Sequence, residues 1–335
     1  FGPRKSAAII EGSKAFSKAL MKKYGIPTAA YEIFTDMEAA IAYVRSGSGT
    51  VVVKADGLAL GKGVFVCADR DEAEQAVRSI MGERIFGESG AKVVIEEFLE
   101  GPEVSVLSFT DGNVVVPMIS SMDHKRALDG DEGPNTGGMG TIAPNPFYTP
   151  EVAGRCMREI FLPTICAMKA EGRTFRGCLY FGLMLTKDGP KVIEYNCRFG
   201  DPETQVVLPL LKTDLLTVMQ ATTNGTLDQL TVEFDPGAAC CVILASGGYP
   251  THYEKGKEIV VTDEGKLKGA TVYHAGTALK DGRLVTSGGR VLGVTCTAPS
   301  LEEAVKRAYD VASGSTFEGV HFRKDIGARA LREVK

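Results

Sequence analysis

The densest group of polar side chains in the sequence lies between residues 194 and 203. Glu194 and Asn196 are two positions apart in a run that reads as a strand, so their side chains face the same side. A carboxylate and an amide oxygen on one face suit Mg²⁺, which takes oxygen ligands and is often bound together with phosphates. Arg198 continues the alternation and could pair with an anionic substrate group. This pattern predicts a metal site beside an anion-binding arginine.

An ordinary structural explanation fits the same residues. Asp201 is a good N-cap and Pro202 suits the first position of a helix, so the segment could be a salt-bridged strand end that leads into a helix. The two interpretations are compatible, and the sequence does not choose between them.

A glycine-rich loop follows an apolar strand. Gly57, Gly61 and Gly63 would let backbone amides approach phosphate oxygens closely, and Lys62 adds a positive charge. The spacing is not that of a Walker A loop, because one spacer is missing and glycine stands where Ser or Thr would bind the metal. A simple hairpin turn is equally compatible with these glycines.

Lys54 favours a phosphate partner, because lysine is unexpected in an apolar strand, although its stem could also carry the charge to solvent.

Two adjacent acids, Glu96 and Glu97, end another apolar strand. Either could accept a hydrogen bond from a nucleotide base or ribose. Without further information, two solvated acids at a strand end are the simpler interpretation.

A long segment between residues 120 and 147 carries few signals of regular structure and is predicted to be a functional loop. Its glycines suggest close backbone approach to a ligand, and its basic residues suggest a phosphate or carboxylate partner. A mobile surface loop is the alternative. The candidate binding residues are Asp123, His124, Lys125, Asn135, Thr136, Gly137 and Gly138.

Several other chemistries are disfavoured by composition and motif. The net charge of −4 offers no basic field for nucleic acid or an anionic membrane, and the longest apolar run is far short of a transmembrane span. The eight cysteines lack the spacing of a zinc site or a disulfide framework, which indicates a reducing, cytoplasmic environment. Neither a G-x-S-x-G elbow nor a kinase signature is present. Cys197 as a nucleophile is disfavoured because no histidine is close in sequence.

The elements that must position these residues alternate between helix and strand. Ser13 is a good N-cap for a helix that Gly25 and Pro27 end. Residues 28–95 read as a small α+β lid, with strands at 31–34, 50–55, 64–67 and 92–98 and helices at 37–45 and 71–81. A long helix at 151–171 precedes a hairpin whose turn is Asp188-Gly189. A helical region at 203–223 follows. After Asp235-Pro236-Gly237 the pattern predicts short strands with glycine turns, closed by a helix at 301–311; the strands are at 238–245, 258–262, 271–275, 283–286 and 290–296.

These residues together resemble the ATP-grasp superfamily and, within it, the phosphoribosylamine–glycine ligase family. The resemblance runs from Phe1 to the C-terminus. It rests on Glu11-Gly12-Ser13-Lys14, Lys54 with its glycine loop, Glu96-Glu97, Asp123-His124-Lys125-Arg126, the block 133–140, and the block 196–205. The resemblance implies an α/β (α+β) fold, in which two α+β subdomains enclose ATP and a small β-rich C-terminal domain follows. The central domain would comprise 1–27 and 96–235, the lid 28–95, and the C-terminal domain 236–335.

The resemblance also implies roles for individual residues. Loop 57–63 would cover the ATP phosphates, and the substrates would be glycine and 5-phosphoribosylamine, joined through glycyl phosphate. The nucleotide would be held by Lys14 and Lys54 at its phosphates and by Glu96, Glu97 and Glu103 at adenine and ribose. Glu194 and Asn196 would bind Mg²⁺ or Mn²⁺. Arg198, Asp201 and Lys125 would be the catalytic residues, on a substrate side completed by the 123–140 loop.

Members of the family carry a further domain before the Phe1-Gly2-Pro3 segment, so we expect this chain to be a fragment, and we expect a monomer. Another ATP-grasp ligase would keep Lys54 and the metal pair but differ in the 123–140 and 198–205 blocks. A non-catalytic ATP-binding module is the alternative of a different class, and the presence of both metal ligands argues against it.

Overall fold

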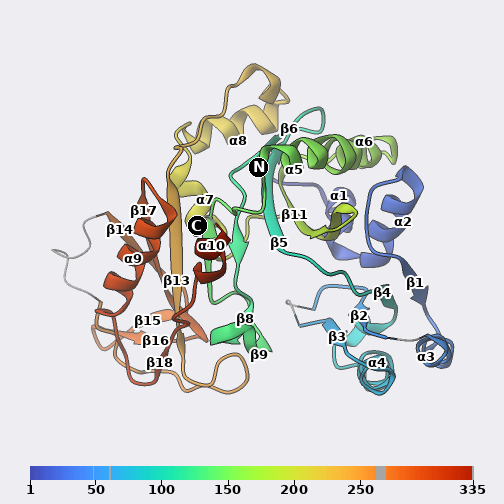
Figure 1. Cartoon of the computed structure of the whole chain (residues 1–335), viewed down its shortest axis with the longest axis horizontal. Coiled ribbons are helices and arrows are strands. Elements are labelled where there is room, and N and C mark those ends of the chain that lie inside the picture. Colours follow the sequence, from blue (N-terminus) through green and yellow to red (C-terminus); the bar gives the residue numbers. More distant parts are fainter. Residues whose placement is uncertain (48, 60–61, 262–268, 334–335) are drawn as a thin grey trace.

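The computed structural model describes residues 1–47, 49–59, 62–261 and 269–333. Its strands form separate antiparallel sheets, and its helices cover them (Figure 1). The helices are α1 Lys5–Gly12, α2 Lys14–Tyr24, α3 Met37–Ser46, α4 Arg70–Val77, α5 Pro150–Cys156, α6 Leu162–Ala170, α7 Thr204–Val207, α8 Leu215–Asn224, α9 Leu301–Ala312 and α10 Ala328–Glu333.

The first sheet has strand order β1-β4-β2-β3 and lies almost entirely within the residues predicted to form a lid, 28–95. α3 and α4 pack on it around a core that includes Val53, Val77 and Ile95. Both helices begin as the sequence predicts, because Asp36 and Asp69 cap them with their side chains. The strands are β1 Tyr31–Phe34, β2 Val51–Ala55, β3 Val64–Cys67 and β4 Val93–Glu97.

The second sheet has strand order β12-β11-β5-β6 and forms the centre of the molecule. α2 covers one part of it; its N-cap Ser13 accepts a hydrogen bond from the amide of Phe16, and Gly25 ends it at φ 68°, as predicted. α5 and α6 are joined by the π-helical segment Met157–Phe161, so the long helix is present. The strands are β5 Glu103–Thr110, β6 Val115–Pro117, β11 Gly177–Thr186 and β12 Gly189–Asn196.

The third sheet has strand order β14-β17-β13-β10-β7, and β18 pairs with β13. β13 is buried throughout, because apolar residues cover both of its faces: α9 on one side, and a cluster around Phe109 and Val207 on the other. Two of its strands, β7 and β10, come from before residue 236, so the boundary predicted there stays a prediction. The strands are β7 Met122–Asp123, β10 Gly140–Ala143, β13 Ala238–Ser246, β14 Ala270–His274, β17 Arg290–Ala298 and β18 Val320–His321.

The segment 120–147 is not the irregular loop that its composition predicts. Besides β7 and β10, it forms a small hairpin of β8 Arg126–Leu128 and β9 Glu132–Asn135. β10 is fully buried because it pairs with β13 on one side and β7 on the other. Pairing with distant strands therefore decided the structure of this segment, and short local patterns did not indicate it.

Three smaller expectations need correction. α7 begins at Thr204, so Asp201 does not cap a helix with Pro202 in its first position. The helical region 203–223 is interrupted between α7 and α8, with only a short 3₁₀ turn at Leu208–Leu210. Of the predicted strand 258–262, Glu258 and Val260 form only isolated bridges, and residue 262 lies outside the described residues. A hairpin of β15 Thr277–Lys280 and β16 Arg283–Thr286 completes the C-terminal part.

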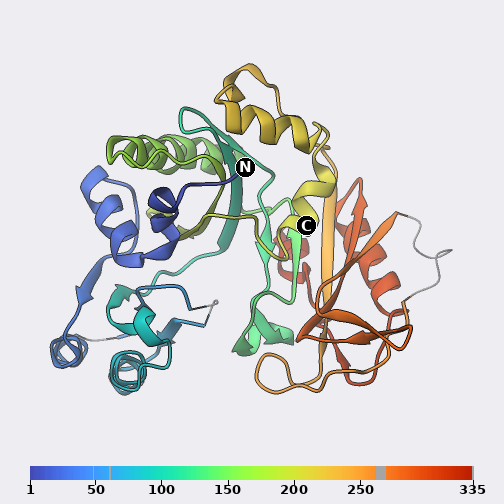
Figure 2. The ribbon, with the colours of Figure 1, turned by 180° about the vertical axis from the view of Figure 1, so that it is seen from behind.

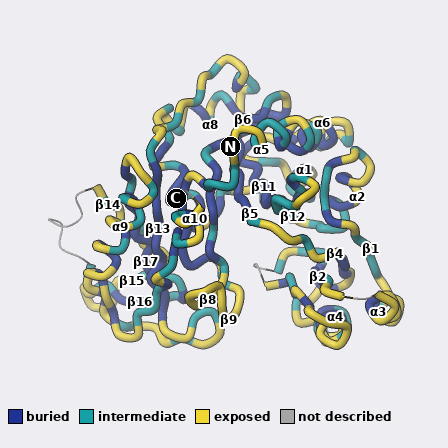
Figure 3. Tube along the Cα trace, viewed as in Figure 1, coloured by how far each residue is buried: buried dark blue, intermediate teal, exposed yellow. Residues whose placement is uncertain are grey.

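The central sheet lies between the lid and the C-terminal part, as the view from behind also shows (Figure 2). Buried residues follow the strands, whereas exposed residues follow loops and outer helix faces (Figure 3). Within the described part of the chain, no helix has the length and apolar character needed to cross a membrane.

Candidate active site

Lys54 is the penultimate residue of β2, and its ammonium is buried 2.9 Å from Oε1 of Glu96 on the neighbouring strand β4. Lys18 of α2 approaches the other oxygen, Oε2, also at 2.9 Å. The lysines also donate to Ile193 O and Thr28 Oγ1 respectively. Burial lowers the pKa of Lys18 to about 8, although Glu96 opposes that shift. One carboxylate therefore compensates two buried ammonium groups, which the sequence did not indicate.

This arrangement changes the expected role of Glu96. Both of its oxygens face lysines inside the protein, and only 4% of its side chain is exposed. The predicted contact of Glu96 with adenine or ribose stays a prediction, and in the structure both of its carboxylate oxygens are occupied by Lys18 and Lys54. Its neighbour Glu97 is more exposed; it accepts a hydrogen bond from the Ala30 amide, which lowers its pKa, and pairs with Lys191.

Lys14 opens α2 beside the glycine-rich loop. Its ammonium donates to Gly57 O at 3.1 Å, and burial lowers its pKa. Asp56 ties the loop to the helix, because its carboxylate accepts hydrogen bonds from Ser13 Oγ and the Ala15 amide. The N-terminus of α2 and the loop thus meet at one place, as phosphate binding requires.

The glycines of this loop have a packing reason as well. A Cβ on Gly57 would lie 2.6 Å from Ser89 Oγ, and one on Gly63 would lie 2.6 Å from the Ala59 Cβ. Lys62 is exposed. Gly61 lies outside the described residues.

The predicted metal ligands lie on β12 with the spacing that the sequence indicates. Asn196 Nδ2 is 3.5 Å from Glu194 Oε1, and Tyr195 between them points into the core on the opposite face. Burial by itself would raise the pKa of Glu194, but Lys125, Lys54 and Lys14 outweigh it and hold that pKa below its usual value. Glycine at position 182 leaves room, because a Cβ there would lie 3.1 Å from Glu194 Cγ. Glu194 is therefore an ionised carboxylate among cations.

Lys125 connects this carboxylate with the substrate side. Its ammonium is 3.1 Å from Glu103 Oε2, and Glu103, the largest influence, raises its pKa well above the ordinary value, with smaller contributions from Tyr180 and Glu194. Glu103 was predicted to contact the nucleotide, and here it is the partner of Lys125. The Lys125 carbonyl accepts hydrogen bonds from the amide and hydroxyl of Thr136.

Asp123 and Glu203 form a second acidic pair nearby. Burial, reinforced by Glu203, raises the pKa of Asp123 well above its usual value. Burial also raises the pKa of Glu203, whose Oε1 accepts a hydrogen bond from the Tyr180 hydroxyl at 3.1 Å. Oδ1 of Asp123 is buried without a hydrogen-bond partner within the described part of the protein. These carboxyl groups hold protons more readily than surface acids do.

Asp201 and its neighbourhood are held by a residue from the C-terminal part, Arg290 of β17. Arg290 contacts the Asp201 carboxylate at 3.1 Å and donates to the Gly137 carbonyl at 2.8 Å. Gly137 N also donates to the Tyr249 hydroxyl. Gly138 adopts φ +116°, and a Cβ there would lie 2.7 Å from Asp123 Oδ1. The glycines at 137 and 138 are thus needed for close packing among protein groups.

Arg198 is mostly exposed and available for a ligand. Its guanidinium lies 3.6 Å from Glu11 Oε1 and donates to Phe199 O and Asn196 Oδ1. Cys197 beside it is no candidate nucleophile, because burial raises the pKa of its thiol to about 12.

His124 has a structural role that the prediction of a substrate ligand missed. The ring is buried; Nδ1 lies 3.2 Å from Gly140 O, and Nε2 lies 3.2 Å from the amide of Gly327. Burial lowers its pKa to about 4, so the ring is neutral at pH 7 and both nitrogens are in use. Asn135 lies exposed on β9, opposite Arg126.

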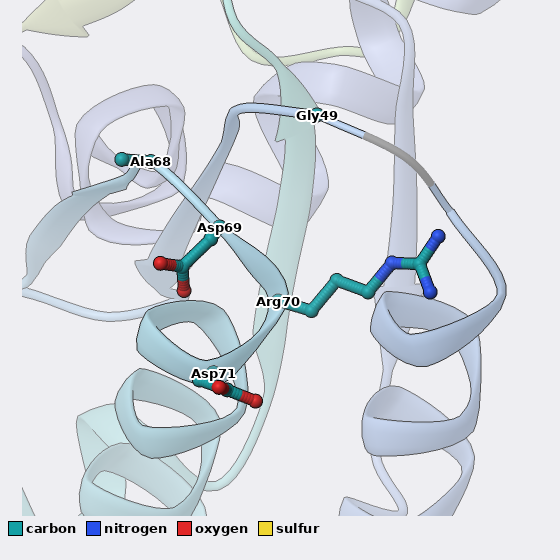
Figure 4. Close-up of a pocket in the computed structure, with 5 residues that line it drawn as sticks. All are labelled: Gly49, Ala68, Asp69, Arg70 and Asp71. Carbon is teal, nitrogen blue, oxygen red and sulfur yellow. The ribbon is translucent and has the colours of Figure 1, made fainter.

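A surface hollow elsewhere carries none of this chemistry. It is lined by Gly49, Ala68, Asp69, Arg70 and Asp71 (Figure 4). Asp69 already uses its carboxylate to accept the Glu72 amide at the start of α4. The hollow shares no residue with the candidate site.

Sequence reasoning did not assign roles to Lys18, Tyr180, Glu203, Tyr249 and Arg290. Glu203 lay within a polar block that was noticed, so proximity to Asp201 was a usable signal. The other residues join the site only through contacts between distant parts of the chain, for which the sequence contains no local signal.

Comparison with known proteins identifies matching families. The model for "Phosphoribosylglycinamide synthetase, ATP-grasp (A) domain" matches residues 12–204, and the model for the C domain of the same enzyme matches residues 239–329. The phosphoribosylamine–glycine ligase of Vibrio vulnificus is 50% identical over 332 residues, covering 99% of this chain and 77% of that protein. The trifunctional purine biosynthetic protein adenosine-3 of Gallus gallus is 50% identical over 333 residues, covering 33% of that protein.

Solved structures agree in fold. The phosphoribosylamine–glycine ligase of Thermotoga maritima superposes with a TM-score of 0.89 at 42% identity, covering 97% of this chain and 81% of that one. The biotin carboxylase domain of a Hydrogenobacter thermophilus 2-oxoglutarate carboxylase superposes with a TM-score of 0.72 at 20% identity, covering 96% of this chain and 69% of that one. The latter resemblance concerns the ATP-grasp fold alone.

Proposed function

This chain belongs to the phosphoribosylglycinamide synthetase family, and on that premise we propose that it is an ATP-dependent ligase that joins glycine to 5-phosphoribosylamine. The reaction forms a C–N bond in purine biosynthesis and gives glycinamide ribonucleotide, ADP and phosphate. The observation that carries the proposal is the row of cations, Lys14, Lys54 and Lys125, around the ionised Glu194. Three cations around one carboxylate can neutralise the negative charge of the transferred phosphoryl group and of the carboxylate that receives it.

A divalent metal fits the residues present. Glu194 supplies a carboxylate, and the neighbouring amide of Asn196, whose Oδ1 lies 3.4 Å from Arg198 Nη2, supplies an oxygen. The described residues contain no group of three or more His, Cys, Asp or Glu arranged for a metal. A small set of protein oxygens suits a hard cation that takes its remaining ligands from phosphates and water. We propose Mg²⁺ or Mn²⁺, which would neutralise phosphate charge there. Glu194 and Asn196 are the residues that would hold it.

The lysines divide the remaining work on the nucleotide side. Lys14 and Lys54 would bind phosphate oxygens, since the Lys14 ammonium contacts the glycine-rich loop at Gly57 O and both ammonium groups lie near enough to Glu194 to lower its pKa. ATP supplies the phosphoryl group that activates the glycine carboxylate as glycyl phosphate, which the amine of 5-phosphoribosylamine then attacks. Because acyl phosphates hydrolyse readily, the lid that carries loop 57–63 would exclude water.

Lys125 acts as a fixed positive charge. Its raised pKa keeps it protonated at pH 7, so it holds negative charge and does not accept a proton. Asp123 and Arg198 are the neighbouring groups proposed to contact the substrates. Asp201 and Gly137 shape this side through Arg290.

The direct test is ADP release with Mg-ATP and glycine, with and without freshly generated 5-phosphoribosylamine. We expect release to need both substrates and to be lost in Glu194→Ala. Glu32→Ala, an exposed acid on β1, is the control and should keep full activity. ADP release with another amine or acid, but not with this pair, would identify a different ATP-grasp ligase. ATP binding without any release would indicate a non-catalytic module.

A further inference from the structure

The C-terminal segment that follows β18 runs along the segment that carries Lys125. His321 Nε2 lies 2.7 Å from the Ala127 carbonyl. The Lys324 amide donates to Asp129 Oδ1 at 2.8 Å. The amide of Gly327 donates to the His124 ring at 3.2 Å. These contacts join parts of the chain that are almost 200 residues apart in sequence, namely 195 positions for the Asp129–Lys324 contact.

Arg323 is the centre of this contact. Only 1% of its side chain is exposed. Its Nε and Nη2 each donate at 2.7 Å to one oxygen of Asp325, so that pair is bidentate. Its Nη1 donates at 2.7 Å to Asp131 Oδ1 and at 3.2 Å to the carbonyl of Arg126. A buried guanidinium with two carboxylate partners is a strong and directional link, because its donors form a rigid fork.

The other end of the link is held in an unusual backbone conformation. Asp131 has φ 57° and Gly130 has φ 70°, so two consecutive residues are left-handed. That conformation is unfavourable for a residue with a side chain. It persists here because Asp131 binds Arg323 and the Gly130 amide donates to Asp325 Oδ2 at 2.9 Å. The turn between β8 and β9 is therefore shaped by the C-terminal segment.

Lys125 lies between two residues that the C-terminal segment holds. His124 before it is bonded to Gly327, and the carbonyl of Arg126 after it accepts from Arg323. With its own carbonyl bound by Thr136, the backbone of Lys125 is held from both sides. Because the backbone of Lys125 is held in this way, its side chain extends from a fixed position to the ion pair with Glu103.

We propose that Arg323 is a positioning residue for the ligase reaction, acting through the backbone that carries Lys125. This inference rests on the function proposed above and extends it to a buried residue whose donors are bound by Asp131, Asp325 and the Arg126 carbonyl. The nucleotide lysines, Lys14 and Lys54, belong to other elements, so the effect should fall on the substrate side alone. Small displacements of a charged group in a site have large kinetic effects.

The test compares four single variants of the chain and the double variant that combines Arg323→Met with Lys125→Ala. Arg323→Met removes the fork, and Asp131→Asn removes only the charge on the partner while asparagine tolerates the left-handed turn. Lys125→Ala removes the positioned group. Arg283→Gln, which removes an exposed partner of Glu258 in the same C-terminal part, is the control. Each is measured by hydrogen exchange of residues 122–136, by ATP affinity, and by turnover with varied glycine and 5-phosphoribosylamine.

We expect faster exchange of residues 122–136 in Arg323→Met and Asp131→Asn but not in Arg283→Gln. Turnover per KM for the substrates should fall about tenfold or more in Arg323→Met, with ATP affinity within about twofold of the unsubstituted chain. In the Lys125→Ala background, Arg323→Met should cause little further loss, because the two act as a unit.

The proposal would be overturned if Arg323→Met lowered turnover per KM by the same factor in the unsubstituted chain and in Lys125→Ala. Unchanged hydrogen exchange and unchanged turnover in Asp131→Asn would overturn it as well. If Arg323→Met does not fold, Asp131→Asn decides. Absence of turnover in the unsubstituted chain would count against the proposed function, whereas the exchange measurement would still report on the link to Arg323.

Discussion

Glu96 is the residue on which the phosphate side of the site depends. Its carboxylate lies between Lys18 and Lys54, and all three side chains are buried. A buried charge is tolerated only when it is paired, so each lysine needs Glu96 to remain inside the protein. Glu96 therefore holds Lys54, the lysine proposed to bind phosphate, in its buried position.

Glu96→Gln keeps the shape of the side chain and removes its charge. We expect the free energy of unfolding to fall by about 3–5 kcal/mol, because two buried ammonium groups lose their counter-charge. Glu97→Gln, at the adjacent exposed position, should cost no more than about 1 kcal/mol. Chemical denaturation measures both. Similar small losses in the two variants would contradict the buried network.

Lys18 makes stability depend on pH. Its pKa in the folded chain, about 8, lies below the ordinary value of 10.5, so the unfolded chain binds more protons between those values. Stability therefore rises with pH through this window, and the cost of the buried charge is fully present below it. As the pH rises from about 8 to 10.5, we expect the unfolding free energy of the unsubstituted chain to increase relative to that of Lys18→Met. A constant difference measured by denaturation across that range would show that Lys18 does not titrate there.

At the scale of elements, the segment between β7 and β10 was expected to be an irregular loop, and in the structure it packs closely against other parts of the protein. Its glycines were expected to let the backbone approach a ligand, and in the structure they let it approach other protein groups. Gly138 lies against Asp123 and Pro202, with distances of 2.7 Å and 2.5 Å to a Cβ placed there. The turn thereby holds in place Asp123, the acid two residues before Lys125.

Gly138→Ala should distort this turn. The left-handed φ and the close contacts act together, so we expect a loss of more than about 1 kcal/mol of stability and a clear loss of ligase turnover. Gly282→Ala is a matched control, because Gly282 has φ +78° with nothing within 4 Å of a Cβ. It should lose stability without losing turnover. Equal turnover in both variants would mean that Asp123 does not depend on the turn.

At the scale of the whole molecule, the C-terminal part completes the substrate side. Arg290 from β17 contacts Asp201 and Gly137, and Tyr249 binds Gly137 from the same part. β7 and β10 are strands of the same sheet as β17. The proposed substrate side thus includes strands of the C-terminal sheet, whereas the proposed nucleotide lysines, Lys14 and Lys54, lie on α2 and on β2 of the lid sheet (Figure 1).

Arg290→Met should weaken binding of the substrates without weakening binding of ATP. We expect KM for glycine or 5-phosphoribosylamine to rise about three- to thirtyfold while ATP affinity stays unchanged, since no nucleotide residue contacts Arg290 in the structure described. Arg307→Met, which loses only a pair with Glu303 on its own helix, is the control. Steady-state kinetics with ATP binding measured separately provides the comparison. If Arg290→Met weakened ATP binding as much as it raised KM for the substrates, the proposed separation of substrate side and nucleotide side would be contradicted.

The sequence by itself determined the features that depend on a few neighbouring residues. Ser13 capping α2 and Gly25 ending it follow from hydrogen bonds and backbone angles within one turn. The hairpin between β11 and β12 is present as well, but its turn residues are Lys187 and Asp188, because Gly189 already pairs with Thr186. The shared face of Glu194 and Asn196 follows from the alternation of a strand. The family resemblance rested on such local blocks as well.

Only the tertiary structure decided which distant groups meet. Lys18 reaches Glu96 across 78 positions, and Arg323 reaches Asp131 across 192. His124 became a buried structural residue, and β10 became a central strand, because of partners that lie beyond residue 236. Such pairings depend on the path of the chain between the partners, and burial then fixes the charge and hydrogen bonding of each side chain. No pattern of neighbouring residues contains that information.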